Sequence, residues 1–317
     1  MFNSDQALEP LKKRAISLHA RHALFFSLCA LTFVFFPAPL SALLSLSWND
    51  DRYTHLPLIP LISFGLISFR RRKIFTDTSN WLWSGTPILL IGATLAFAGQ
   101  AQSFAGDLGL CLAISGVILI WIGCFVCCYG LSVLREAIFP LSMLLLFIPL
   151  PAPIVEAAQV ALQQASGEVT YRLFHLVGVP VFRQGLVFSL PGLDIEVARE
   201  CSGIRSTIAL LITSLVLGHL FLRSAWRMTA LVLLTIPIAI FKNAVRITTL
   251  SWLGVYVSKD YLLGQVHNFS GLPVSALGLC LIMFILLLLQ RPERRASRAS
   301  AARQNSPSVQ PNSNYTD

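Results

Sequence analysis

The clearest shortage in this sequence is that of charge. Only 12% of its 317 residues are Asp, Glu, Lys or Arg, whereas a soluble domain carries about 25%. This shortage excludes an ordinary soluble domain and indicates an integral membrane protein. The formal net charge of +9 does not indicate a nucleic-acid partner, because the basic residues form short clusters between apolar runs and no continuous basic patch.

Cysteines are few and show no recognisable framework. Seven are present, too few and too scattered for a disulfide-stabilised fold. Six lie within apolar runs, where a free thiol behaves as a small hydrophobe: Cys29, Cys111, Cys124, Cys127, Cys128 and Cys280. The spacing of Cys124, Cys127 and Cys128 superficially resembles a metal or redox motif, but no histidine or carboxylate lies nearby in the sequence. We therefore expect neither a metal site nor a cofactor.

The sequence also shows no cleavable signal peptide, no internal repeat and no second globular domain. The first apolar run is too long for the core of a signal peptide and has no small-residue cleavage site. Because about 20 apolar residues cross the hydrocarbon core, we interpret it as the first of eight spans: 22–46, 55–69, 81–99, 106–130, 137–154, 204–222, 228–241 and 271–290. The predicted fold class is all-α, a polytopic membrane protein of about eight transmembrane helices. The helix at 228–241 is expected to continue past Phe241, with Lys242 snorkelling to the interface.

The distribution of positive charge predicts the orientation of these spans. If the N-terminus lies in the cytoplasm, the inner segments carry sixteen Lys and Arg residues and the outer segments seven. Inner segments of membrane proteins are enriched in these residues, so both termini are predicted to be cytoplasmic. Residues 1–290 are predicted to form one transmembrane domain. Residues 291–317, rich in Arg, Ser, Ala and Asn, are predicted to be a disordered basic cytoplasmic tail.

The one large outer segment, 155–200, contains two patterns. Apolar residues recur at helical spacing over 155–175 with Gln and Glu between them, which predicts an extracytoplasmic amphipathic helix on the outer membrane surface. Residues 179–198 alternate between apolar and polar side chains around prolines and glycines, which predicts a short hairpin.

Cys201 differs from the other cysteines in its neighbours. It follows Glu200 at the start of the span at 204–222, and Arg205 is four residues further on. Positive charge and a helix N-terminus both favour the thiolate, which is the nucleophilic form of cysteine. The alternative interpretation is a small buried residue, which is the usual role of a cysteine.

Arg246 and His267 fall on the same predicted side as Cys201. Arg246, one turn after Lys242, can hold an oxyanion or a carboxylate with two parallel hydrogen bonds. An arginine at a helix end can equally well snorkel to lipid phosphate. His267 precedes the last span, and a Cys–His pair is the minimal activated thiol. A structural histidine is the alternative.

Several segments together resemble the exosortase/archaeosortase family of membrane transpeptidases. These segments are Trp48–His55, Arg70–Arg72, Phe147–Pro151, Glu200–Ser206, Asn243–Ile247, and His267 with Gly271. The most specific is Glu200–Ser206, which matches the nucleophile motif of the family. The resemblance implies that Cys201 is the acyl-thioester nucleophile, with Arg246 and His267 as its polar partners. The implied supporting residues are Arg205, Glu200 and Asn243.

The same resemblance implies a function. Such an enzyme cleaves a C-terminal sorting signal, made of a short motif such as Pro-Glu-Pro, a membrane helix and a basic tail, from secreted proteins. It then passes the secreted protein to an acceptor. The implied location is the bacterial inner membrane, with the active site facing the periplasm. The implied partners are these substrates and the lipid bilayer.

Three alternatives stay open from the sequence. A cysteine protease would use the same thiol but end in hydrolysis. A non-enzymatic component of exopolysaccharide export would use Arg205 and Arg246 to bind anionic lipid or polymer. A plain structural membrane protein would need none of these residues for chemistry.

Overall fold

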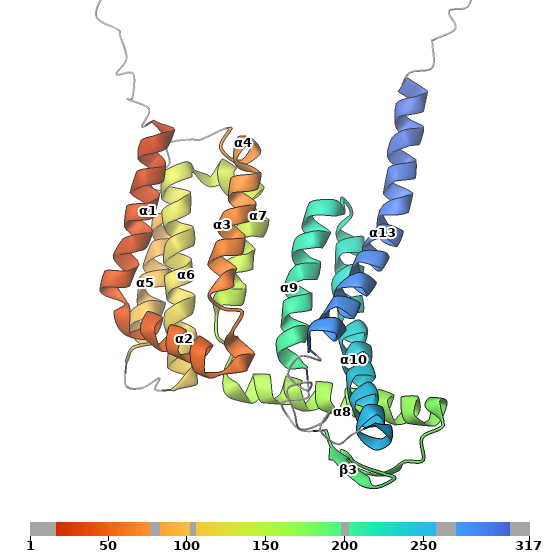
Figure 1. Ribbon diagram of the computed structural model, residues 1–317. Helices are drawn as coiled ribbons and strands as arrows, with labels where there is room; N and C mark the ends of the chain where they lie inside the picture. The colour runs from red at the N-terminus through yellow and green to blue at the C-terminus, as the bar shows by residue number, and fades with distance from the viewer. Residues whose placement is uncertain (1–16, 77–82, 102–105, 198–202, 258–270, 305–317) are drawn as a thin grey trace, which may run out of the picture. The chain divides into compact units, whose positions relative to one another are not determined.

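The computed structural model describes residues 17–76, 83–101, 106–197, 203–257 and 271–304. Helices account for most of these residues, with one small sheet (Figure 1). The chain divides into two compact units, residues 1–157 and 158–317. Helix α8 (Ala152–Val177) begins in the first unit and lies mostly in the second.

The first unit is a bundle built around α6 (Asp107–Tyr129), which contacts α1, α2, α5 and α7. Its other elements are α1 (Leu18–Phe35), α2 (Pro37–Asn49), η2 (Asp51–Tyr53), α3 (Leu58–Phe69), α4 (Arg71–Ile74), α5 (Thr86–Ala98), α7 (Leu131–Met143) and η4 (Leu144–Phe147). Aromatic rings of α6 form part of the core, where Tyr129 packs against Phe75 and Phe125 with centroids 4.8 and 4.9 Å away.

Helices α5 and α6 pack closely because glycines face each other across their interface. A Cβ added at Gly92 would lie 2.8 Å from the backbone nitrogen of Ile120, and a Cβ at Gly116 would meet the backbone of Ala96. Small residues of this kind let helix backbones approach in a bilayer, where apolar side chains alone give little drive to associate. The α5–α6 pair is therefore stabilised by close van der Waals packing of the two backbones.

The second unit contains a three-helix bundle of α9 (Ile204–Phe221), α10 (Ala225–Tyr256) and α13 (Gly271–Gln304). Helices α9 and α10 are antiparallel neighbours joined by a short connection, and α13 contacts both (Figure 1). Buried side chains of all three helices form its core, among them Leu210, Leu231 and Ile282. The bundle therefore brings the start of α9 next to the C-terminal half of α10.

An antiparallel three-stranded sheet follows α8, in the order β1 (Phe182–Gln184), β2 (Val187–Leu190) and β3 (Leu193–Glu196). Phe174 of α8, Phe188 of β2 and Ile247 of α10 belong to one buried cluster. The backbone of Val197, at the end of the sheet, is held by Leu186 and by the side chain of Gln163, which donates to the Val197 carbonyl. The predicted hairpin is thus confirmed and extended by a third strand.

The all-α membrane fold is confirmed, but the predicted count of eight spans is not. In the described part of the chain, five helices are long and apolar enough to cross a membrane: α1, α6, α9, α10 and the segment Pro273–Arg291 of α13. A sixth is reached if α7 with η4 and α8, which bend by 94° at their junction, count as one broken span.

Three predicted spans differ from the structure for identifiable reasons. The run at 22–46 is two helices, because the chain breaks at Phe36 and α2 starts with Pro37, which has no N–H to continue a helix. Helix α5 starts only at Thr86, with a proline in its first turn, and has 13 residues. Helix α3 has 12 residues. Both are shorter than the roughly 20 residues that cross a bilayer.

The boundaries of other helices also differ from the predicted ones. The helix predicted at 155–175 is present as α8, and its position on the membrane surface stays a prediction. Helix α10 continues past Phe241 as expected, but it runs to Tyr256. Helix α13 extends through Gln304, so the segment predicted as disordered from Arg291 starts as helix, and residues 305–317 lie outside the described residues.

Candidate functional site

The start of α9 is fixed by Gly203. This residue caps the helix with φ +70°, in the left-handed region that favours glycine. Its carbonyl oxygen accepts hydrogen bonds from the Thr207 amide at 2.9 Å, the Thr207 hydroxyl at 2.8 Å and the Ser206 hydroxyl at 2.9 Å. The first turn of α9 is thus held by side chains as well as by the backbone.

Helix α10 meets this turn with two buried polar residues. The side chain of Asn243, only 3% exposed, packs against Gly203: a Cβ at Gly203 would lie 3.0 Å from Asn243 Oδ1. Lys242, 2% exposed, donates a hydrogen bond from Nζ to Ser206 Oγ at 2.5 Å. The two helices therefore share a buried polar contact inside the bundle.

Helix α13 closes over the same contact. A Cβ at Gly278 would lie 2.9 Å from Cδ of Lys242 and 3.0 Å from Leu210 of α9. Gly278 therefore leaves room for the aliphatic stem of the lysine. All three helices of the bundle meet around Lys242.

The predicted site residues divide into those that the structure describes and those that it does not. Arg246 lies one turn after Lys242 on α10 and is partly buried, whereas Arg205 on α9 is exposed. Asn243 lies against Gly203, which belongs to the nucleophile-like motif, so described residues of these two resembling segments are neighbours. Cys201, Glu200 and His267 lie outside the described residues.

Sequence reasoning missed the burial of Lys242. The lysine was predicted to snorkel at a helix end, which is wrong because α10 continues to Tyr256 and the lysine is inside the bundle. The sequence does contain a signal for this burial. Lys242, Asn243 and Arg246 lie within about one helical turn, and the residues on both sides of them are mostly apolar. A second buried partner on another span was then to be expected.

The first unit holds a separate polar cluster that joins two of the resembling segments. Tyr53 donates a hydrogen bond to the Leu150 carbonyl at 2.8 Å. Arg52 binds the Asp50 carboxylate, with Nη2–Oδ2 at 2.6 Å and Nε contacting both oxygens at 3.0 Å. These residues and Asp107, which accepts from the Ala152 amide at 3.0 Å, line a pocket of about 100 Å³.

The hydrogen bonds from Arg52 hold the pKa of the Asp50 carboxyl below its usual value, and partial burial opposes them. A depressed carboxyl pKa stabilises the fold above the unfolded value of about 3.9, and that contribution is lost as pH falls through the lower folded value. We expect Arg52→Met to lower the free energy of unfolding of the detergent-solubilised protein by about 1 kcal/mol at neutral pH.

That cost is expected to shrink toward zero in acid, measured as the melting temperature against pH. Lys73→Met is the matched control, because the Lys73–Glu136 pair is 2.7 Å long but has side chains 69% and 44% exposed. It should change the melting temperature little at any pH. An Arg52→Met cost that is the same in acid as at neutral pH would contradict the ion-pair explanation.

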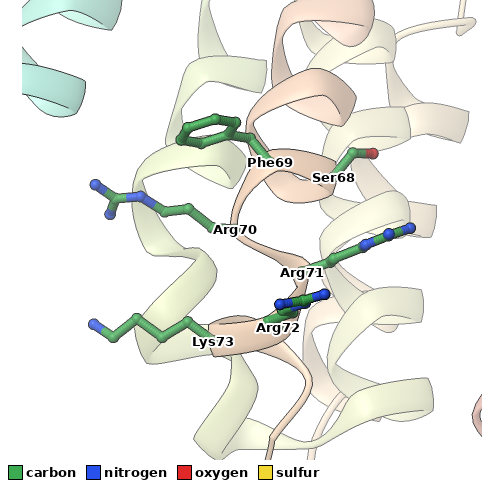
Figure 2. A pocket seen from close by; sticks show the side chains of 6 residues that line it. All are labelled: Ser68, Phe69, Arg70, Arg71, Arg72 and Lys73. Carbon is green, nitrogen blue, oxygen red and sulfur yellow. The ribbon is translucent and has the colours of Figure 1, made fainter.

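A second pocket, of about 540 Å³, lies at the end of α3 and is lined by Ser68, Phe69, Arg70, Arg71, Arg72 and Lys73. Figure 2 shows Arg70 and Lys73 extending to one side of the ribbon and Arg71 to the other. Because these cations diverge, they do not converge on a single bound group. Within the described ranges, no group of three His, Cys, Asp or Glu side chains could hold a metal ion.

Comparisons with known proteins bear on the whole of this arrangement. Neither the curated proteins nor the solved structures contain a match to this chain. The family model described as transmembrane exosortase matches residues 47–285. That range runs from the Asp50–Arg52 pocket through the motif at the start of α9 to the first half of α13. With several membrane-spanning helices and the polar junction of α9, α10 and α13 inside the matched range, the chain belongs to the transmembrane exosortase family.

Proposed function

We propose that this protein is a membrane cysteine transpeptidase that removes the C-terminal sorting signal of secreted proteins and transfers them to an acceptor. Membership of the exosortase family, over residues 47–285, is the observation that carries the proposal, because it supports a membrane sorting transpeptidase in general. The finer assignments are the thiol of Cys201 and a signal of Pro-Glu-Pro type. These rest on the resemblance of Glu200–Ser206 to the nucleophile motif of the family.

The described neighbours of Cys201 support a role for its thiol. Cys201 precedes Gly203 by two residues, and Gly203 is the N-cap of an 18-residue helix. The N-terminus of a helix carries partial positive charge, which stabilises a thiolate or an oxyanion formed beside it. The segment that contains Cys201 runs from Val197, fixed at the sheet, to Gly203, fixed by its hydrogen bonds.

The proposed chemistry is acyl transfer in two steps. The Cys201 thiolate attacks the scissile carbonyl, and the C–N bond breaks when the leaving amine takes a proton, which leaves a thioester. An amine acceptor then attacks the thioester, gives up a proton and restores the thiol. Arg246 would stabilise the oxyanion of each step, and His267 would take and return protons.

The charge distribution in the first unit supports the predicted orientation. One end of this unit, where α6 ends and α7 begins, is basic. Lys73 pairs there with Glu136, and Arg21 donates to the Cys128 carbonyl at 3.0 Å. The basic residues at this end are Arg21, Arg70–Lys73 and Arg135. The Asp50–Arg52 pocket belongs to the opposite end of α6, beside Asp107. A basic cytoplasmic end and an outer end of mixed charge agree with the positive-inside rule. We therefore propose the inner membrane with cytoplasmic termini.

The test is the mass of the released product. The protein is co-expressed with a reporter that ends in a Pro-Glu-Pro motif, an apolar helix and a basic tail, and the reporter is then isolated and weighed. Transpeptidation predicts a truncated reporter with an added group on its new C-terminus, whereas a protease predicts the same truncation with a free carboxylate. If several reporters, each with a different signal of this kind, all stay uncut, both enzymatic assignments are contradicted and the non-enzymatic alternative is favoured.

Added hydroxylamine sharpens this test. It intercepts a thioester and converts the reporter C-terminus to a hydroxamate, so the proposed intermediate gives a product of distinct mass. A reporter that is cut but never carries the hydroxamate would indicate that the reaction does not pass through an acyl-thioester.

A further inference from the structure

The apolar face of α8 is its more exposed face. We define the α8 stripe by the apolar residues that recur at helical spacing: Ala158, Leu162, Ala165, Val169, Leu173 and Leu176. None of these residues is buried, and Leu176 is 81% exposed. Gln163, Ser166 and Thr170 share another face of the same helix and are only 6%, 1% and 0% exposed. A helix on the surface of a soluble protein does the reverse, because it packs its apolar stripe on the core.

The buried polar face of α8 contacts its own unit. Gln163 donates to the Val197 carbonyl at the end of the sheet, whereas Thr170 donates to the Ser166 carbonyl within the helix at 2.7 Å. The Ser166 hydroxyl has no hydrogen-bond partner among the described residues, which makes its burial unfavourable. In water, the chain would gain free energy by rotating α8 so that its stripe faced inward. The observed orientation is therefore stable where the stripe meets a medium less polar than water.

The exposed apolar surface continues from the α8 stripe back to a membrane-spanning segment. Leu145 of η4, Leu150 and Ile154 are 52%, 53% and 55% exposed. At this junction α8 bends by 94° from α7 with η4. Figure 1 also shows α8 crossing α10 at a steep angle, and Phe174 of α8 and Ile247 of α10 share one buried cluster. A helix that crosses transmembrane helices in this way runs along the membrane plane.

A basic cluster lies beside the C-terminal half of the α8 stripe. Glu168 pairs with Arg172, with Nε–Oε1 at 3.2 Å, and with Arg183 of β1, with Nη1–Oε2 at 2.6 Å. Two arginines and one glutamate leave a formal charge of +1, and the Arg172 side chain is 76% exposed. Interfacial helices carry basic residues beside their apolar face, where long side chains reach lipid phosphate. The charges of α8 therefore suit the level of the headgroups.

A second copy of the chain and the anchor of a substrate are the alternative partners of the stripe. The exposed apolar residues extend past the end of α8 to Val177 and to Phe182 of β1, which are 55% and 63% exposed. The surface therefore bends from η4 along α8 to the sheet. A protein partner needs a complementary shape over its whole contact, whereas fluid lipid covers a bent surface without one. The extent of the surface favours lipid.

We propose that α8 lies within one leaflet of the bilayer, with the α8 stripe in contact with lipid acyl chains and its polar face turned to the sheet. Under the predicted orientation this is the outer leaflet. The partner is thus phospholipid, and the contact is a property of the fold that does not depend on the proposed function.

Immersion of α8 also sets the depth of the candidate site. Ile247, which shares a buried cluster with Phe174 of α8, follows Asn243 by one turn of α10. Asn243 in turn packs against Gly203 at the start of α9. The polar junction of α9 and α10 is therefore packed next to the in-plane helix, near the depth of the lipid headgroups.

The first test uses the wild-type full-length protein in phospholipid nanodiscs. It is labelled either by a membrane-confined diazirine or by hydroxyl radicals in the water, and mass spectrometry locates the labels, each normalised to the unfolded protein. We expect diazirine label at Leu162 and Leu176 several-fold above that at Gln164 and His175, which are exposed on the polar side of α8. Hydroxyl radicals should give the reverse order. Equal diazirine labelling of the two sides would overturn the proposal.

A photo-crosslinking residue at position 176 identifies the partner directly. Benzoylphenylalanine replaces Leu176 in the nanodisc-embedded protein, and the same probe at His175 is the matched control, one residue away on the other side. Lipid adducts several-fold more abundant at 176 than at 175 support the proposal. Adducts with a second copy, adducts with a co-expressed reporter, or no lipid adduct at 176 would each overturn it. Because no readout is cleavage, failure here leaves the proposed function standing.

A pair of leucine substitutions checks which face of α8 is buried. Ser166→Leu should lower the melting temperature in nanodiscs, because the larger side chain must fit a site that is 1% exposed. Gln164→Leu is the matched control on an exposed position and should leave the melting temperature close to that of the wild type. If Ser166→Leu is as well tolerated as Gln164→Leu, the polar face is not turned to the sheet and the proposal fails.

Discussion

Cells that express Cys201→Ala are expected to retain the co-expressed reporter in its full-length, membrane-anchored form. Acyl transfer through a thioester requires a nucleophilic sulfur, and alanine supplies none. The expected loss is therefore complete within the detection limit, larger than the roughly 10²- to 10³-fold loss expected from removing one oxyanion donor, the role proposed for Arg246. The measurement is the ratio of cut to uncut reporter on an immunoblot.

Two controls make this result interpretable. Cys280→Ala replaces an exposed thiol on α13, and it should leave cleavage unchanged. Cys201→Ser should be as inactive as Cys201→Ala if the sulfur is the nucleophile, whereas a non-enzymatic role would tolerate the serine. Normal removal of the reporter tail in Cys201→Ala would sink the assignment of the nucleophile.

Gly203→Ala is expected to have the second largest effect. Its φ of +70° costs an alanine about 1 kcal/mol or more. Its Cβ would also lie 3.0 Å from Oδ1 and 3.1 Å from Cγ of Asn243, so the Asn243 side chain must move by a few tenths of an ångström. A displacement of about 1 Å at a reacting group can cost on the order of 100-fold in rate. Because the strained cap and the Asn243 contact act together, we expect a loss of reporter cleavage that approaches this size, with a lower melting temperature.

Substitutions at two other glycines distinguish backbone strain from the contact with Asn243. Gly178 has a similar φ of +75° but nothing within 4 Å of an added Cβ, so Gly178→Ala tests backbone strain alone. Gly65 lies inside α3, again with nothing within 4 Å, so Gly65→Ala should be neutral or slightly stabilising. If Gly178→Ala lowers the cleavage rate as much as Gly203→Ala, contact with Asn243 does not explain the effect.

Composition predicted the class of the molecule but not the ends of its helices. Apolar runs mark the membrane segments because hydropathy depends only on which residues are present. Where a helix breaks depends on single residues: Pro37 splits the first run, and Gly85 and Pro87 delay the start of α5. The sheet that follows α8 was predictable because its residues alternate, while its third strand pairs through backbone groups that no sequence pattern records.

The candidate site was only partly predictable for a similar reason. Motif spacing pointed to Asn243 and to the segment that contains Gly203, and the structure places these two in contact. The partner of Lys242 could not be read from its own helix, because Ser206 is 36 positions away and the contact depends on how α9 and α10 pack. Positions of Cys201 and His267 lie outside the described residues, so their roles stay predictions.

The short helices of the first unit have a consequence for the lipid around them. At 1.5 Å per residue, the 12 residues of α3 and the 13 residues of α5 cover roughly 20 Å of a hydrocarbon core that is about 30 Å thick. Where these helices face lipid, the mismatch favours a locally thinner bilayer. Under the proposed function, a substrate anchor that diffuses into such a region would have more hydrophobic length than the bilayer covers. The end of that anchor would then be raised toward the water.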